Sequence, residues 1–100
     1  MDFRRLKHII MTVDFKNIEV EVNFEGERGK ADVSKDLANY CKCRTTDIGF
    51  EDFCREIYHK GTVDVPEEYK EAIIEIIRTK ECPFYACIKR GIIEALNKTE

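Results

Sequence analysis

The sequence predicts an α+β fold, in which an N-terminal antiparallel β-hairpin packs against four α-helices. Three observations support this class. Apolar and polar residues alternate over residues 8–25, which is the period of a strand. Apolar residues recur at steps of three and four over residues 33–60 and again over residues 66–97, which is the period of a helix. Residues 62–65 alternate as well and could add a short third strand.

The hairpin is the clearest prediction. Its apolar side chains are Ile9, Met11, Val13, Phe15, Ile18, Val20, Val22 and Phe24. With a two-residue loop at Lys16 and Asn17, all eight lie on one face, and Phe15 pairs with Ile18. Residues 26–30 then form a polar loop that ends the hairpin. This loop lacks the spacing of a phosphate-binding loop, so no nucleotide site is predicted.

Two helices are predicted between the hairpin and Gly61, over residues 33–43 and residues 46–60. Polar residues able to cap them lie at the start of each one: Asp32 or Ser34, and Thr46 or Asp47. Gly61 is the glycine that commonly ends a helix, so we expect the second helix to stop there.

Two further helices are predicted over residues 66–79 and residues 83–97, each opened by a proline at its first position. Ile76 and Ile92 lie in the middle of their apolar stripes. We therefore expect both to be core residues.

The composition indicates one folded domain, residues 1–100. Hydrophobic residues make up 43% and charged residues 37% of the chain, as in ordinary folded proteins. No apolar run approaches the roughly 20 residues that cross a bilayer, and the basic N-terminus has no signal-peptide core. Five cysteines, an odd number, without an export signal indicate reduced thiols and a cytoplasmic protein.

Cysteine and histidine are the residues most able to bind a metal. The candidates are Cys41, Cys43, Cys54, Cys82, Cys87, His8 and His59. Structural zinc sites draw ligand pairs from short motifs such as Cys-x-x-Cys, and no such pair occurs. Cysteines on the apolar stripes are explained as small core hydrophobes. We therefore expect no metal site and no cofactor.

Catalysis is not predicted either. Cys54 and His59 are five residues apart on one predicted helix, so their side chains would not face each other. Ser34 is explained as a helix cap. We expect no catalytic residue and no enzyme activity.

An acidic ridge is predicted on the third helix, at Glu67, Glu71 and Glu75, which recur at steps of four. A solvated helix face is the simpler interpretation. A docking surface for a basic partner is the functional one.

Residues 34–60 resemble a helix-turn-helix. Lys35-Asp36-Leu37-Ala38 opens the segment, and Ile48 follows Ala38 by ten residues. The turn glycine is replaced by Lys42, and an apolar anchor of the second helix is replaced by Glu51. The resemblance implies a nucleic-acid surface made of basic residues near these helices: Lys42, Arg44, Arg55, His59 and Lys60. A net charge of −3 argues mildly against this function.

We therefore expect a small non-enzymatic interaction or accessory protein, with a nucleic-acid-associated module as the alternative. The partner would be a protein, with no membrane contact. A homodimer is considered through the edge of the first strand, where Ile10 and Thr12 are flanked by few charges. Residues 62–65 or residues 1–7 could instead cover that edge.

Overall fold

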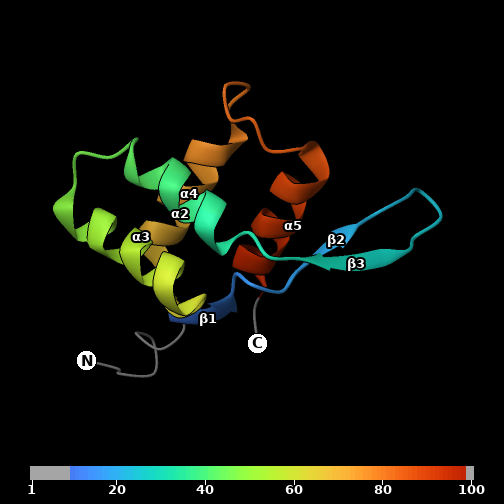
Figure 1. Cartoon of the computed structure of the whole chain (residues 1–100), viewed down its shortest axis with the longest axis horizontal. Helices are drawn as coiled ribbons and strands as arrows, with labels where there is room; N and C mark the ends of the chain where they lie inside the picture. Colours follow the sequence, from blue (N-terminus) through green and yellow to red (C-terminus); the bar gives the residue numbers. More distant parts are fainter. Residues whose placement is uncertain (1–9, 99–100) are drawn as a thin grey trace.

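A computed structural model describes residues 10–98 of the chain, and it confirms the α+β class. Four helices accompany two antiparallel sheets of two strands each (Figure 1). The elements in chain order are β1 (Ile10–Asp14), β2 (Ile18–Glu21), β3 (Arg28–Ala31), α2 (Ser34–Lys42), α3 (Ile48–Lys60), β4 (Thr62–Pro66), α4 (Glu67–Arg78) and α5 (Ala86–Asn97). His8, named above as a possible metal ligand, lies outside the described residues. The same holds for residues 1–7, named above as able to cover the edge of the first strand.

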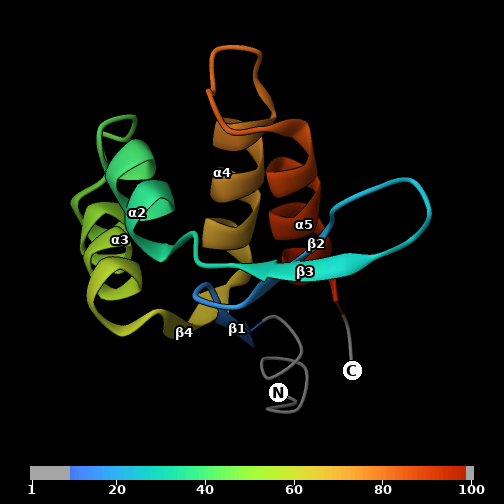
Figure 2. The ribbon, with the colours of Figure 1, turned by 45° about the vertical axis from the view of Figure 1, so that its right-hand side comes forward.

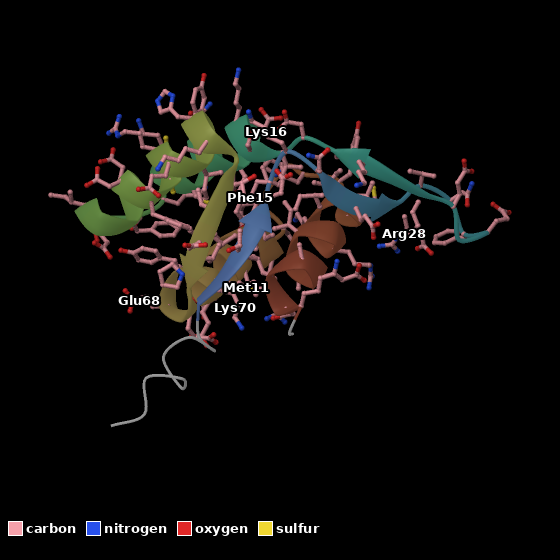
Figure 3. The ribbon with its side chains drawn as sticks, turned by 90° about the horizontal axis from the view of Figure 1, so that it is seen from below. Met11, Phe15, Lys16, Arg28, Glu68 and Lys70 are labelled. Carbon is pink, nitrogen blue, oxygen red and sulfur yellow. The ribbon has the colours of Figure 1, made fainter. Side chains whose placement is uncertain are left out.

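The predicted pairing of the first two strands is wrong. β1 pairs with β4, so that Val13 lies opposite Val63, and β2 pairs with β3, so that Val20 lies opposite Gly29. Figure 3 shows β1, which carries Met11, running beside β4. The third strand predicted over residues 62–65 is thus present as β4. It pairs with β1, which the sequence had predicted to pair with β2.

The chain passes from one sheet to the other at Phe15. The Phe15 N–H donates a hydrogen bond to the Gly61 carbonyl at 2.8 Å, and the Phe15 carbonyl accepts one from the Val33 N–H at 2.9 Å. These long-range main-chain bonds use the groups that a tight hairpin would have needed. This is the physical reason why the two strands separate after a turn and do not pair with each other.

The predicted polar loop at residues 26–30 is correct only in its first part. Gly26 lies in the turn with a φ of +96°, a conformation that glycine adopts readily. From Arg28 onward the chain forms β3. The β2–β3 hairpin projects beyond the helices on one side of the molecule (Figure 2).

The helix boundaries follow the predicted caps at α3 and α4. At α2 the predicted cap is wrong: Val33 is the N-cap residue without a side-chain cap, and the Ser34 hydroxyl instead donates to Asp32 Oδ1 at 2.8 Å. Asp47 caps α3 by accepting a hydrogen bond from the Gly49 N–H at 2.9 Å, and Gly61 ends α3 with a φ of +79°. α4 begins at Glu67, immediately after Pro66. α5 also differs from the prediction, since it begins at Ala86 and not at residue 83.

The segment before α5 is packed as a connector. Cys82 is buried, and the ring of Phe84 lies 5.6 Å from that of Tyr40, between centroids. The N–H groups of Ile88 and Lys89 in the first turn of α5 donate to the Tyr85 carbonyl. Burial of these side chains against α2 therefore replaces the extra helical turn that Pro83 suggested.

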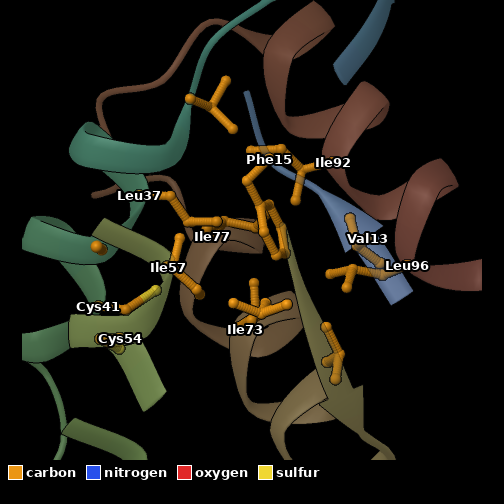
Figure 4. Packing of buried hydrophobic residues seen from close by; sticks show 14 of the residues in the cluster. Val13, Phe15, Leu37, Cys41, Cys54, Ile57, Ile73, Ile77, Ile92 and Leu96 are labelled. Carbon is orange, nitrogen blue, oxygen red and sulfur yellow. The ribbon is translucent and has the colours of Figure 1, made fainter. Parts of the chain in front are cut away.

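The core is one cluster centred on Phe15 (Figure 4). Its fully buried side chains come from the turn after β1, from β2, from β4 and from all four helices, and they include Phe15, Ile18, Leu37, Ile57, Val65, Ile73, Ile77, Ile92 and Leu96. Ile92 is therefore a core residue as predicted. Ile76 is only half-buried, because its side chain lines a groove.

Candidate functional site

A groove of about 620 Å³ lies between α4 and the α2–α3 pair, and we call it the α4 groove. Side chains from α2, from α3, from the loop that joins them, from α4 and from the turn after α4 line it. The lining residues are Tyr40, Arg44, Thr45, Asp47, Phe50, Glu68, Tyr69, Ala72, Glu75, Ile76, Thr79 and Glu81.

Aromatic rings pack closely on one side of the groove. The ring of Tyr69 lies 5.3 Å from that of Phe50, edge to face, and 5.0 Å from that of Phe53. Phe50 and Phe53 are buried and Tyr69 is half-buried, so Tyr69 is held by the core while part of it faces the groove. The Tyr69 hydroxyl also lies close to Gly49, where an added Cβ would be only 3.0 Å away.

The charge of the groove is acidic. Four carboxylates and one guanidinium line it, from Asp47, Glu68, Glu75, Glu81 and Arg44. Within the described residues, none of the four carboxylates forms a salt bridge. Burial raises the pKa of Tyr69, and the nearby carboxylates of Asp47, Glu68 and Asp52 raise it further. The phenol therefore stays neutral and can donate a hydrogen bond at neutral pH.

The chain itself places one cation in this groove. The Arg44 guanidinium carbon lies 3.5 Å from the centroid of the Tyr40 ring, and Arg44 Nη1 donates a hydrogen bond to the Tyr40 carbonyl at 3.0 Å. A guanidinium stacked on an aromatic face is a favourable cation–π contact. An arginine of the chain itself therefore stacks on an aromatic ring that lines the groove.

The predicted acidic ridge on α4 is divided by the structure. Glu75 lines the α4 groove. Glu67 lies 3.1 Å from the Lys70 ammonium and forms a salt bridge with it. Glu71 is exposed. Of the three, Glu75 is therefore the one placed beside the aromatic rings.

The five predicted basic residues are not on one surface. Lys42, Arg55 and His59 line a second cavity, of about 180 Å³, between α2 and α3, which we call the α2–α3 cavity. Arg44 lies in the α4 groove. Lys60 is the last residue of α3. The nucleic-acid hypothesis remains a prediction, with three of its residues gathered together.

The five cysteines are free thiols, two of them exposed and three buried. Cys41 donates a hydrogen bond to Cys54, which together with burial raises the pKa of Cys41; accepting that bond lowers the pKa of Cys54. Cys54 and His59 both line the α2–α3 cavity. No group of three or more potential metal ligands is found among residues 10–98.

Sequence reasoning missed Tyr40, Asp47, Tyr69 and Glu81 as groove residues. Tyr40 and Tyr69 fall within the apolar repeats of residues 33–60 and 66–97, and Asp47 is the predicted cap of α3, which it also is. A tyrosine on a stripe next to glutamates was the available signal, because its hydroxyl favours an exposed edge.

Comparison of the chain with family models, curated proteins and solved structures found no match. Across the part of the chain that the structure describes, no helix has the length and apolar character needed to cross a membrane.

Proposed function

We propose that this protein is a small non-enzymatic interaction protein, and that its α4 groove binds an exposed lysine or arginine side chain of a partner protein. One observation carries the proposal. Aromatic faces and four carboxylates surround a groove of about 620 Å³, and an arginine of the chain itself already stacks on one of its rings.

The expected binding is specific but weak. A cation over an aromatic ring contributes about 0.5 to 2 kcal/mol, depending on how far it is desolvated. An exposed ion pair adds up to about 1 kcal/mol. A partner that fills the groove with one side chain therefore binds weakly, and further contacts along a basic segment would supply the remaining affinity.

Two variants of equal charge test the groove. Glu75→Gln removes a carboxylate that lines it, whereas Glu71→Gln removes an exposed carboxylate one turn away on the same helix. The probe is a short arginine–glycine peptide, titrated into labelled protein and followed by amide chemical shifts. We expect the largest shifts around Gly49 and Tyr69, and roughly two- to fivefold weaker binding for Glu75→Gln only.

A glutamate–glycine peptide of the same length is the control for nonspecific contact, and it should produce no shifts in the groove. Equal weakening by Glu71→Gln and Glu75→Gln would show that only the overall charge of α4 attracts the peptide. Shifts that avoid the groove would contradict the proposal directly.

Three finer proposals accompany this one. A cytoplasmic location is supported by the five free thiols. A homodimer through β1 would use the edge of β1 that does not pair with β4. The nucleic-acid alternative is supported by the grouping of Lys42, Arg55 and His59, and a steep loss of DNA binding with rising salt would favour it.

A further inference from the structure

The tip of the β2–β3 hairpin presents a phenylalanine to solvent. Phe24 is 98% exposed and its neighbour Val22 is 55% exposed, whereas Ile18 and Val20 at the base of β2 are buried. Burying a ring of this size is strongly favourable. Among residues 10–98 the ring of Phe24 is left almost fully in solvent, so this side chain is available to a binding partner.

The turn that carries Phe24 is ordered by hydrogen bonds. Asn23 Oδ1 accepts hydrogen bonds from the N–H groups of Glu25 at 3.1 Å and Glu27 at 3.2 Å. Asn23 Nδ2 donates to a carboxylate oxygen of Glu27 at 2.8 Å, and the Val22 N–H donates to the Glu27 carbonyl at 2.9 Å. A ring on an ordered turn loses less conformational entropy on binding than one on a loose loop.

The tip is also acidic. Glu25 and Glu27 follow Phe24 closely, and the nearest cation along the chain is Arg28. Arg28 Nη2 is engaged by carboxylate oxygens of Glu94 at 3.4 Å and Glu19 at 3.8 Å. The chemistry that fits this tip is therefore an apolar cavity with basic side chains around it.

The α2–α3 cavity has that chemistry. Its apolar lining comes from Ala38, Cys54 and the ring of Tyr58, and its basic side chains are Lys42, Arg55 and His59; Asn39 and the single carboxylate of Glu51 complete it. Arg55 Nε also lies 4.0 Å from an exposed Asp52 carboxylate oxygen, whereas Lys42 forms no salt bridge within the described residues. Its volume of about 180 Å³ exceeds the roughly 150 Å³ of a cavity known to hold a benzene ring. The α4 groove, with four carboxylates, would repel the acidic tip.

We infer that Phe24 of one copy of this protein docks in the α2–α3 cavity of a second copy, with Glu25 and Glu27 facing Lys42 and Arg55. The contact is between copies because the hairpin tip and α3 lie at opposite ends of the molecule (Figures 1 and 2). Such a contact joins two different surfaces, so it builds either closed pairs or longer chains. It is independent of the α4 groove.

Sedimentation velocity from micromolar to near-millimolar protein tests this contact. Wild-type protein should exceed the monomer mass of 11.7 kDa as concentration rises. Phe24→Ser should weaken the association by roughly tenfold or more, because it removes the buried ring. Tyr85→Ser is the matched control. Tyr85 is another aromatic side chain, 79% exposed, and it lines neither the α2–α3 cavity nor the α4 groove. It should leave the association unchanged.

A mixing experiment assigns the two halves of the contact. The double variant Lys42→Glu, Arg55→Glu changes exposed residues, so it should fold while repelling the tip. Each variant alone should be monomeric. A mixture of the double variant with Phe24→Ser should form dimers, because one copy supplies an intact tip and the other an intact cavity.

Three results would overturn the inference. They are wild-type protein that stays at the monomer mass throughout, association that survives Phe24→Ser, and a mixture of the two monomeric variants that remains monomeric. Each would mean that Phe24 either has no partner in this chain or binds a different protein.

Discussion

Two turns of this molecule share a hydrogen-bonding pattern and have opposite surroundings. In the first, a carboxylate oxygen of Asp14 accepts a hydrogen bond from the N–H two residues later (3.0 Å), and its carbonyl accepts one from the N–H three residues later (3.2 Å). In the second, Asn23 forms the same two bonds, at 3.1 and 3.3 Å. A phenylalanine follows in each case, Phe15 in the first turn and Phe24 in the second.

The two phenylalanines have opposite exposures. Phe15 is 0% exposed at the centre of the core, and Phe24 is 98% exposed at the hairpin tip. The turn motif fixes the local chain path in both places. Whether the next side chain is buried depends on what packs over it, and only the first turn has helices around it. A shared local motif therefore serves folding in one place and presentation of a side chain in the other.

The largest expected effect is that of Phe15→Ala. Removing a fully buried phenylalanine side chain leaves a cavity and costs about 3 to 5 kcal/mol of unfolding free energy. Urea unfolding followed by circular dichroism measures this loss. A loss near that of a surface substitution, about 0.5 kcal/mol, would mean that the core does not depend on Phe15.

Gly91→Ala should come next. An added Cβ at Gly91 would lie 2.6 Å from the Glu19 carbonyl oxygen and 2.8 Å from Val20 Cγ1, because α5 packs directly on β2. Overpacking of this kind costs about 1 to 3 kcal/mol. Gly49→Ala is the matched control, since it also lies in a helix but meets only side-chain atoms, of Tyr69 and Asp47. Equal unfolding curves for the two variants would refute the close packing of α5 on β2.

Phe24→Ser should have little effect on stability. The side chain is in water in the monomer, so its removal should change the unfolding free energy by less than about 0.5 kcal/mol. Dilute protein must be used, because association would stabilise the wild type by mass action. A loss comparable to that of Phe15→Ala would place Phe24 in the core of the fold.

The smallest expected effect is the pH dependence of stability that the Asp14 carboxylate gives to the first turn. Asn17 Nδ2 and the Lys16 N–H donate hydrogen bonds to the Asp14 carboxylate, and these bonds lower its pKa below the ordinary 3.8. The resulting stabilisation is present above that ordinary value and is lost as pH falls through the lowered one. Asn23 does not titrate, so the two hydrogen bonds that its side-chain and main-chain carbonyls accept should not depend on its own protonation.

Thermal melts of wild type and Asp14→Asn at decreasing pH measure this difference. The gap between the two proteins should be widest near neutral pH and should narrow below about pH 4 as the wild-type carboxyl is protonated. A gap that is constant with pH would show that the charge of Asp14 has no role in its turn.

The sequence predicted the buried faces of the strands better than their partners. Val13, Phe15, Ile18 and Val20 are buried as the alternation indicated, because a period of two specifies a face whichever strand lies alongside. Val22 and Phe24, predicted on the same face, are exposed, because the β2–β3 hairpin projects beyond the helices. The alternation carries no information about which strand pairs with which. Two main-chain bonds of Phe15, to residues far along the chain, decide the pairing here.

The candidate site was predicted least well. Glu75 was identified as a possible partner residue, but its neighbours in the groove come from segments as distant as Tyr40 and Glu81. Spacing along a single helix cannot show which side chains a tertiary fold brings together. The α5 start was misplaced for the same reason, since the packing of Phe84 against Tyr40 is a tertiary contact.

Amide hydrogen exchange tests most directly the claim that the hairpin tip is held only by local bonds and is presented for contact. The Val33 N–H and the Val22 N–H each donate a main-chain bond of 2.9 Å, the first to Phe15 in the core and the second to Glu27 at the tip. We predict that Val33 exchanges with the free energy of global unfolding, and that Val22 exchanges through local opening of much lower free energy. Equal exchange free energies at Val22 and Val33 would contradict the account.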